Sequence, residues 1–171
     1  KPLTDCFKDR IKLKSPVTSI RRLPTHVEVQ TYNGKVENFD TVFVAAHSDQ
    51  ALRMLADPTR EEQSVLGAIR YQENEATIHT DESVLPVNRR AWAAWNHHVL
   101  EKTIGRVAVT YNMNILQSIQ APLQFCVTLN NDQAVSRKHI IRKIIYEHPI
   151  YTPDTVSAQQ RQREINGVQR T

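Results

Sequence analysis

The stretch "FDTVFVAAHSDQALRML", residues 39–55, predicts a buried strand that runs directly into a helix. We expect a strand at residues 41–46 that is covered on both faces, because residues 42–46 are all apolar and rich in valine. Ser48 suits a helix N-cap, and Asp49 would lie near the positive end of the helix dipole. A strand followed by a helix is the local form of a nucleotide-binding βα unit, but this turn has no glycine to approach a phosphate.

The segment before this stretch predicts a β-hairpin. Residues 27–31 alternate between apolar and polar side chains, as a half-buried strand does. Asn33 and Gly34 follow, and this pair supplies at low cost the two positive φ angles that a type I′ turn needs. Such a turn would pair Thr31 with Val36.

The segment after it predicts short helices. Thr59 and Glu62 have the spacing of a capping box, so a second helix is expected after the one at residues 48–55. Residues 152–165 predict a further helix with a proline near its start. The last six residues, "NGVQRT", resemble the opening of a strand.

Between these helices, the sequence is typical of an antiparallel sheet with one covered face. Val109 and Tyr111 share one face of a strictly alternating segment, and Asn112 and Asn114 share the other. Pro149 should end the last strand. Strands are expected at residues 71–81, 89–98, 106–116, 123–132 and 139–152.

These elements predict an α+β fold, with a mixed, mainly antiparallel sheet and a few short helices. Residues 1–46 are expected to be part of one domain, residues 47–150 a larger antiparallel portion, and residues 151–171 a helix that returns to the first domain. Because the chain starts at Lys1 and has only four glycines, we expect a piece of a longer protein.

Composition excludes several classes of protein. Hydrophobic residues make up 40% and charged residues 23%, which is typical of a soluble globular protein, and no apolar run could span a bilayer. The net charge of +4 comes from scattered basic pairs, which argues against a nucleic-acid partner. Two distant cysteines indicate reduced thiols in a cytoplasmic protein, and the scattered histidines predict no metal site.

No motif for nucleophilic or phosphate chemistry is present: the sequence lacks GxSxG, a Walker loop and GxGxxG. Candidates for a substrate pocket lie in the predicted sheet. Trp92, Trp95 and Tyr111 are either core residues or the lining of a flat apolar pocket beside an aromatic cofactor. Asn114 faces either a polar cavity or solvent.

Seven stretches of the sequence carry a resemblance to a known family. In order along the chain they are "SPVTSIRR" (15–22), "VEVQTYNG" (27–34), the long stretch 37–71 that contains "VFVAAHSDQALRML", "TDESVLPVNRRAWAAWN" (80–96), "VTYNMNILQSI" (109–119), "HPIYT" (148–152) and "AQQRQREING" (158–167). Together they resemble the flavin-dependent amine oxidase superfamily, and in particular its branch of bacterial predicted NAD/FAD-binding oxidoreductases.

The resemblance implies a longer parent enzyme with an FAD/NAD(P)-binding domain and a substrate domain, in which a substrate loses hydride to FAD. The backbone of Val17 would bind the FAD adenine, and the small residues Ala45 and Ala46 would lie at the strand end where the cofactor approaches. The phosphate loop of such a parent lies outside this chain, so we expect the chain alone to be inactive and not to retain FAD.

The alternative is a self-contained α+β module that binds a ligand or another protein. The expected partners are a small-molecule substrate and, through exposed sheet edges, a second copy of the chain.

Overall fold

The computed structural model describes residues 3–100 and 105–171. Contacts divide the chain into two compact units: Lys1–Arg70 with Ile150–Thr171 form the first unit, and Tyr71–Pro149 form the second. Residues 47–70 therefore pack with the first unit, whereas the division made from sequence placed them with the antiparallel portion. The assignment of these units to a flavin-binding and a substrate domain stays a prediction.

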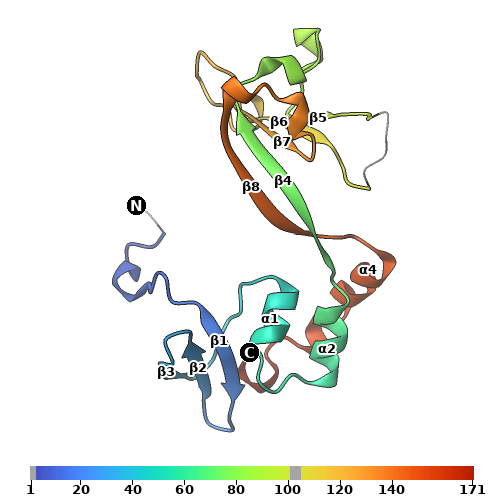
Figure 1. Cartoon of the computed structure of the whole chain (residues 1–171). Coiled ribbons are helices and arrows are strands. Elements are labelled where there is room, and N and C mark those ends of the chain that lie inside the picture. The colour runs from blue at the N-terminus through green and yellow to red at the C-terminus, as the bar shows by residue number, and fades with distance from the viewer. Residues whose placement is uncertain (1–2, 101–104) are drawn as a thin grey trace. The chain divides into compact units, whose positions relative to one another are not determined.

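The first unit combines a small sheet with short helices (Figure 1). Its elements are β1 (Val17–Arg22), β2 (Val27–Thr31), β3 (Val36–Phe39), α1 (Ser48–Met54), α2 (Arg60–Gly67) and α4 (Pro153–Gln160). The sheet is antiparallel, in the order β1-β2-β3. Single-turn 3₁₀ helices in the whole described chain lie at Lys8–Arg10, Glu82–Val84, Arg89–Ala91, Asp132–Ala134, Arg137–His139, Gln162–Glu164 and Val168–Arg170.

The hairpin between β2 and β3 is confirmed, but its turn and register differ from the prediction. Val36 pairs with Gln30 rather than with Thr31. Gly34 N–H donates to Thr31 O (2.8 Å), and Gly34 alone in the loop has a positive φ (82°). This is a three-residue loop with glycine in the left-handed position. The Asn33 side chain accepts hydrogen bonds from Thr31 Oγ1 and Lys35 N, which favours this loop over a type I′ turn.

The predicted strand at residues 41–46 is wrong. The structure has no strand there, and only one face of the segment is covered. Val42 and Val44 pack against a core of Ile20, Val27 and Leu55, whereas Phe43 is 94% exposed. A strand that is buried on both faces needs strands beside it and layers above and below it, and the described residues supply only the one layer.

The helices form largely as predicted. α2 begins with the capping box, in which Thr59 Oγ1 accepts from Glu62 N and the Glu62 carboxylate accepts from Thr59 N. α4 carries a proline in its first turn. The N-cap of α1 is His47, so Ser48 is its first helical residue.

The strand predicted at the end of the chain is absent from the structure. Gly167, Gln169 and Arg170 have positive φ angles, which an extended strand cannot contain, and Gly167 N–H donates to Thr171 O (2.8 Å).

The second unit is built on a five-stranded antiparallel sheet in the order β5-β6-β7-β4-β8 (Figure 1). Its elements are β4 (Tyr71–His79), β5 (Trp95–His97), β6 (Val109–Asn112), α3 (Met113–Leu116), β7 (Cys126–Leu129) and β8 (Ile140–Pro149). β4 begins where predicted and ends two residues earlier, and β8 begins one residue later than predicted and ends at Pro149, as expected. The α+β fold class is confirmed.

β6 is shorter than the alternating pattern predicted. Asn112 ends the strand because its side chain accepts from Ile115 N (3.3 Å) and caps α3, so the residues after it are helical. β5 is also shortened, because a 3₁₀ turn at Arg89–Ala91 replaces its first part. Within residues 3–100 and 105–171, no helix combines the length and the apolar character that crossing a membrane requires.

Candidate functional site

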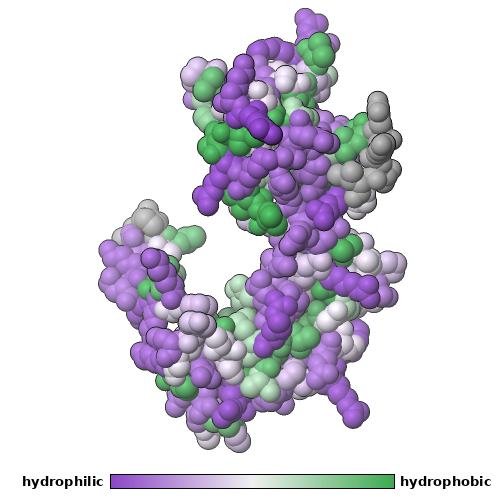
Figure 2. Space-filling model, viewed as in Figure 1, coloured by the Kyte–Doolittle hydropathy of each residue, from purple (hydrophilic) through white to green (hydrophobic). Residues whose placement is uncertain are grey.

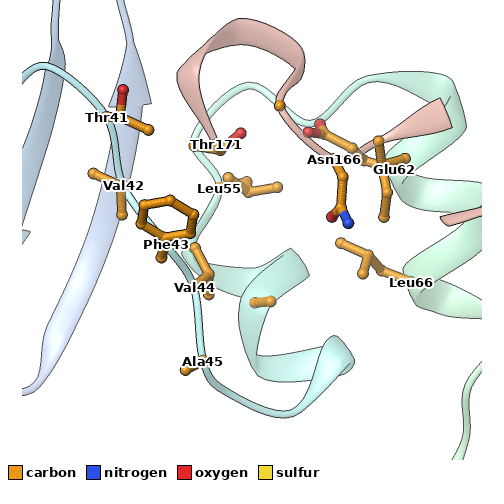
Figure 3. A pocket seen from close by; sticks show the side chains of 13 residues that line it. Thr41, Val42, Phe43, Val44, Ala45, Leu55, Glu62, Leu66, Asn166 and Thr171 are labelled. Carbon is orange, nitrogen blue, oxygen red and sulfur yellow. The ribbon is translucent and has the colours of Figure 1, made fainter. Parts of the chain in front are cut away.

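An apolar cavity of about 530 Å³ lies within the first unit (Figure 3). The segment Thr41–Ala45 forms one wall, and residues from α1, α2 and the end of the chain form the others. These residues are Ala51, Leu55, Glu62, Leu66, Ile165, Asn166, Gly167 and Thr171. Val42 N–H donates to Arg170 O (3.0 Å), which joins this wall to the end of the chain.

The three residues that the resemblance connects with FAD have different surroundings in the structure. Ala45 lines this cavity, and Ala46 follows it as an exposed residue outside the lining. Val17 is the first residue of β1 and packs against the Ile20 core instead. Their contact with FAD stays a prediction.

The only carboxylate among the lining residues is already neutralised by a buried cation. Arg22 Nη2 donates to Glu62 Oε2 (2.9 Å), Arg22 Nη1 donates to Glu62 Oε1, and the side chains are 2% and 4% exposed. Burial alone would raise the pKa of Glu62, but the hydrogen bonds and charge of Arg22 and the backbone N–H of Thr59 lower it. Glu62 therefore stays ionised and paired, and it is not a free base in the cavity.

In the second unit, two of the predicted pocket residues come together. Trp95 on β5 pairs with Tyr111 on β6, and their rings make an edge-to-face contact with centroids 5.4 Å apart. Trp95 is 65% exposed, so it is not a core residue. Figure 2 shows that the visible surface is mainly hydrophilic, with separate apolar patches.

The other two pocket candidates have structural contacts. Trp92 Nε1 donates to Pro86 O (2.8 Å), and Arg89 lies 4.8 Å above its ring. Asn114 lies in α3, where its side chain donates to Leu123 O and accepts from Phe125 N. The role of all four residues in substrate binding stays a prediction.

The opposite face of the same sheet holds a chain of hydrogen-bonded polar side chains that the sequence did not reveal. His79 Nε2 bonds to Thr128 Oγ1 (2.8 Å), Thr128 Oγ1 to Thr110 Oγ1 (2.7 Å), and Thr110 Oγ1 to His98 Nε2 (2.7 Å). His79, Thr110 and Thr128 have no exposed surface. We refer to these four residues as the His79–His98 chain.

Burial shapes the acid–base properties of this face. Burial lowers the pKa of His79, an effect that nearby Asp81 opposes and His139 reinforces. Burial, reinforced by the charge of His97, also lowers the pKa of His98. Burial raises the pKa of Cys126 to about 11, so this thiol is not a nucleophile at neutral pH. Both histidines of the chain are therefore neutral at neutral pH.

Buried neutral histidines should make the stability of the folded protein sensitive to acid. Because the folded state lowers the pKa of His79, the unfolded state binds a proton more readily, and stability is lost as pH falls below about 6.5. The loss can reach about 1.4 kcal/mol for each pH unit. Urea unfolding at about pH 7.5 and about pH 5.5 measures it. The decrease should be smaller in His79→Gln than in the surface control His148→Gln, and wild-type stability that does not fall would contradict the prediction.

The sequence predicts part of the His79–His98 chain, namely the faces on which its two threonines lie. Thr110 alternates with Val109 and Tyr111, and Thr128 with Val127 and Leu129, so both were expected on one face. Which strands are neighbours, and in which register, was not available from these short segments.

Among residues 3–100 and 105–171, no group of three or more His, Cys, Asp or Glu side chains could hold a metal ion.

Three comparisons relate the chain to known proteins. The family model for flavin containing amine oxidoreductase matches residues 6–114. No curated protein gives a significant match. The solved structure of a CLA-producing fatty acid isomerase from P. acnes is similar, with a TM-score of 0.52 and 13% identity over 92% of this chain.

This chain spans 41% of the isomerase structure, so it corresponds to part of that fold. A triple mutant of putrescine oxidase aligns over 79% of this chain and 30% of its own, with 12% identity and a TM-score of 0.48, which is too low to support a conclusion about the fold. The family match covers more than half of the residues and extends into both compact units. The chain therefore belongs to the flavin containing amine oxidoreductase family.

Proposed function

We propose that the chain forms the middle of an FAD-dependent oxidoreductase of the amine oxidase type. The family match, which extends from the first unit into the second, is the observation that carries this proposal. The partial coverage of the isomerase structure also favours a longer parent. In that parent, FAD would accept hydride from a C–H bond of the substrate, and dioxygen or another acceptor would reoxidise it. A cytoplasmic location is part of the same proposal.

The described residues fit only part of an FAD site. The wall of Thr41–Ala45 and the cavity beside it could accept an apolar body. A diphosphate needs cations or a row of backbone N–H donors, as at the N-terminus of a helix. The cavity lining offers no cation, because its one charged side chain is the carboxylate of Glu62. We therefore assign no step of the reaction to these residues.

This mismatch supports the proposal that the chain alone does not retain FAD. The chain should purify without flavin absorbance, and titration with FAD should give no saturable quenching of flavin fluorescence. The longer product of the same reading frame should contain a glycine-rich βαβ segment and purify as a yellow protein. A yellow chromophore that copurifies stoichiometrically with the chain itself would contradict the proposal, as would a reading frame that contains no such segment.

A second copy of the chain remains a proposed partner. β8 is an edge strand of its sheet, and Ile141, Ile145 and Tyr146 are 57%, 66% and 53% exposed. Edge strands with exposed apolar side chains tend to pair with another chain.

A further inference from the structure

The His79–His98 chain has a defined direction. The backbone N–H of Asp81 donates to His79 Nδ1 (3.1 Å), and a backbone N–H can only donate. His79 Nδ1 is therefore an acceptor without a proton. A neutral imidazole carries one proton, which must then be on Nε2, so His79 donates to Thr128 Oγ1.

The direction continues across the sheet. Thr110 and Thr128 pair directly across neighbouring strands. Among the described residues, the hydroxyl hydrogen of Thr128 has one available acceptor, Thr110 Oγ1 (2.7 Å). If Thr110 instead donated to Thr128, the hydrogen of Thr128 would be buried without a partner, which is costly. Thr128 therefore donates to Thr110.

Thr110 in turn donates to the next residue along the chain, because His98 Nε2 is its remaining neighbour (2.7 Å). This fixes the tautomer of His98: Nε2 accepts, and the ring proton is on Nδ1. The Nδ1–H group has no partner among the described residues, and the lowered pKa of His98, caused by burial and His97, keeps the ring neutral.

His98 lines a second cavity, of about 380 Å³, within the second unit. Its other lining residues include Val84–Val87 and Val99–Leu100, whose side chains are aliphatic, although the lining surface is polar as well as apolar. Asn96 also lines the cavity, but its amide is engaged with Ala93 and Thr110. His97 is also among the lining residues, but it alternates with His98 along the strand, which directs its side chain to the opposite face.

We propose that this cavity binds a small molecule with an apolar body and one acceptor oxygen, a carboxylate or carbonyl, that accepts a hydrogen bond from His98 Nδ1. Thr110, Thr128 and His79 are positioning residues that hold His98 in the donating tautomer. The proposal concerns the second unit alone and does not depend on flavin binding.

The tautomers can be measured by ¹⁵N NMR of the histidine rings in the full chain. Wild type should show a proton on Nε2 of His79 and on Nδ1 of His98. Thr110→Val removes the donor to His98 and should populate its Nε2–H form. Thr110→Ser keeps the hydroxyl and should retain the wild-type signals.

Thr77→Val is the matched control. Thr77 lies in the same buried row, directly opposite Thr128, but its hydroxyl has no hydrogen-bond partner among the described residues. This variant should leave both tautomers unchanged. An Nε2–H tautomer of His98 in wild type, or no change in Thr110→Val, would overturn the assignment.

Binding is tested with two probes of similar shape, cyclohexanecarboxylate and cyclohexylmethylammonium. The carboxylate should shift the Nδ1 resonance of His98 saturably, and the ammonium, which only donates, should not. Thr110→Val should weaken carboxylate binding by about tenfold, the effect of one hydrogen bond, although Thr110 does not line the cavity. Thr77→Val and Thr110→Ser should bind as wild type does. Equal binding of both probes, no saturable binding in wild type, or undiminished binding in Thr110→Val would overturn the proposal.

Discussion

Glu62→Leu is expected to lower the free energy of unfolding by about 3–5 kcal/mol, because it leaves the buried guanidinium of Arg22 without its main counter-charge. Arg22 is 8% exposed, and among the described residues its side chain keeps bonds to Asp57 and Thr171 alone in this variant. Burial works to lower the pKa of Arg22, but Glu62 and Asp57 outweigh it, so Arg22 stays charged. The variant must therefore bury a cation whose remaining counter-charge, Asp57, is 42% exposed. The loss of the capping contact to Thr59 adds to the cost. Urea denaturation measures the change.

Two further variants distinguish the loss of the Arg22–Glu62 ion pair from general effects of substitution on stability. Glu61→Leu changes the neighbouring exposed carboxylate and should alter stability by less than about 0.5 kcal/mol. The double variant Arg22→Met/Glu62→Leu should recover much of the lost stability, since an apolar pair often replaces a buried ion pair at little cost. If the double variant is as unstable as the sum of its single variants, the buried charge is not the cause.

The Arg22–Glu62 pair also shows how much the local sequence could predict. The capping box of Thr59 and Glu62 follows from a spacing of three residues, and the structure contains it. Nothing local indicates that the same carboxylate also binds Arg22, which lies 40 residues earlier. Such a pair depends on how β1 and α2 pack, and packing is a property of the whole first unit.

The sheets show a similar limit. The alternation around Val109 and Tyr111 correctly places these two residues on one face, because strand geometry alone determines it. The end of β6 was missed because Asn112 can continue a strand or cap a helix, and its side-chain bond to Ile115 decides between them. For Thr41–Ala46, composition indicated burial on both faces, but burial depends on neighbours that a single segment cannot specify.

The His79–His98 chain was missed for the same physical reason. His79 lies far from His98 in the sequence, and each threonine is one polar residue in an alternating strand. Register brings Thr110 beside Thr128, and only then does a continuous polar row exist. Histidine, threonine and asparagine are mostly exposed or only partly buried in proteins, so their complete burial on one face is the structural sign of this network.

The His79–His98 chain leads to the second prediction of a large effect. It compares the stability of variants at two buried threonines, Thr128 and Thr77. Thr128→Val removes the acceptor of His79 Nε2–H and the donor to Thr110. His79 is fully buried, so its N–H cannot bond to water instead, and we expect a loss of about 2–3 kcal/mol in the free energy of unfolding. Thr77→Val makes the same change of shape on the neighbouring strand, where the hydroxyl already lacks a partner.

The expected effect of Thr77→Val is therefore between zero and a gain of about 1 kcal/mol, since removing an unpaired buried hydroxyl relieves a cost. Volume and β-propensity are nearly the same in both substitutions, so the difference between the two variants isolates the hydrogen bonds. Denaturant unfolding at about pH 7.5, where His79 is neutral, gives this difference. Equal stability of the two variants would mean that the short contacts of Thr128 do not stabilise the fold, and the directed chain inferred from them would then have no energetic basis.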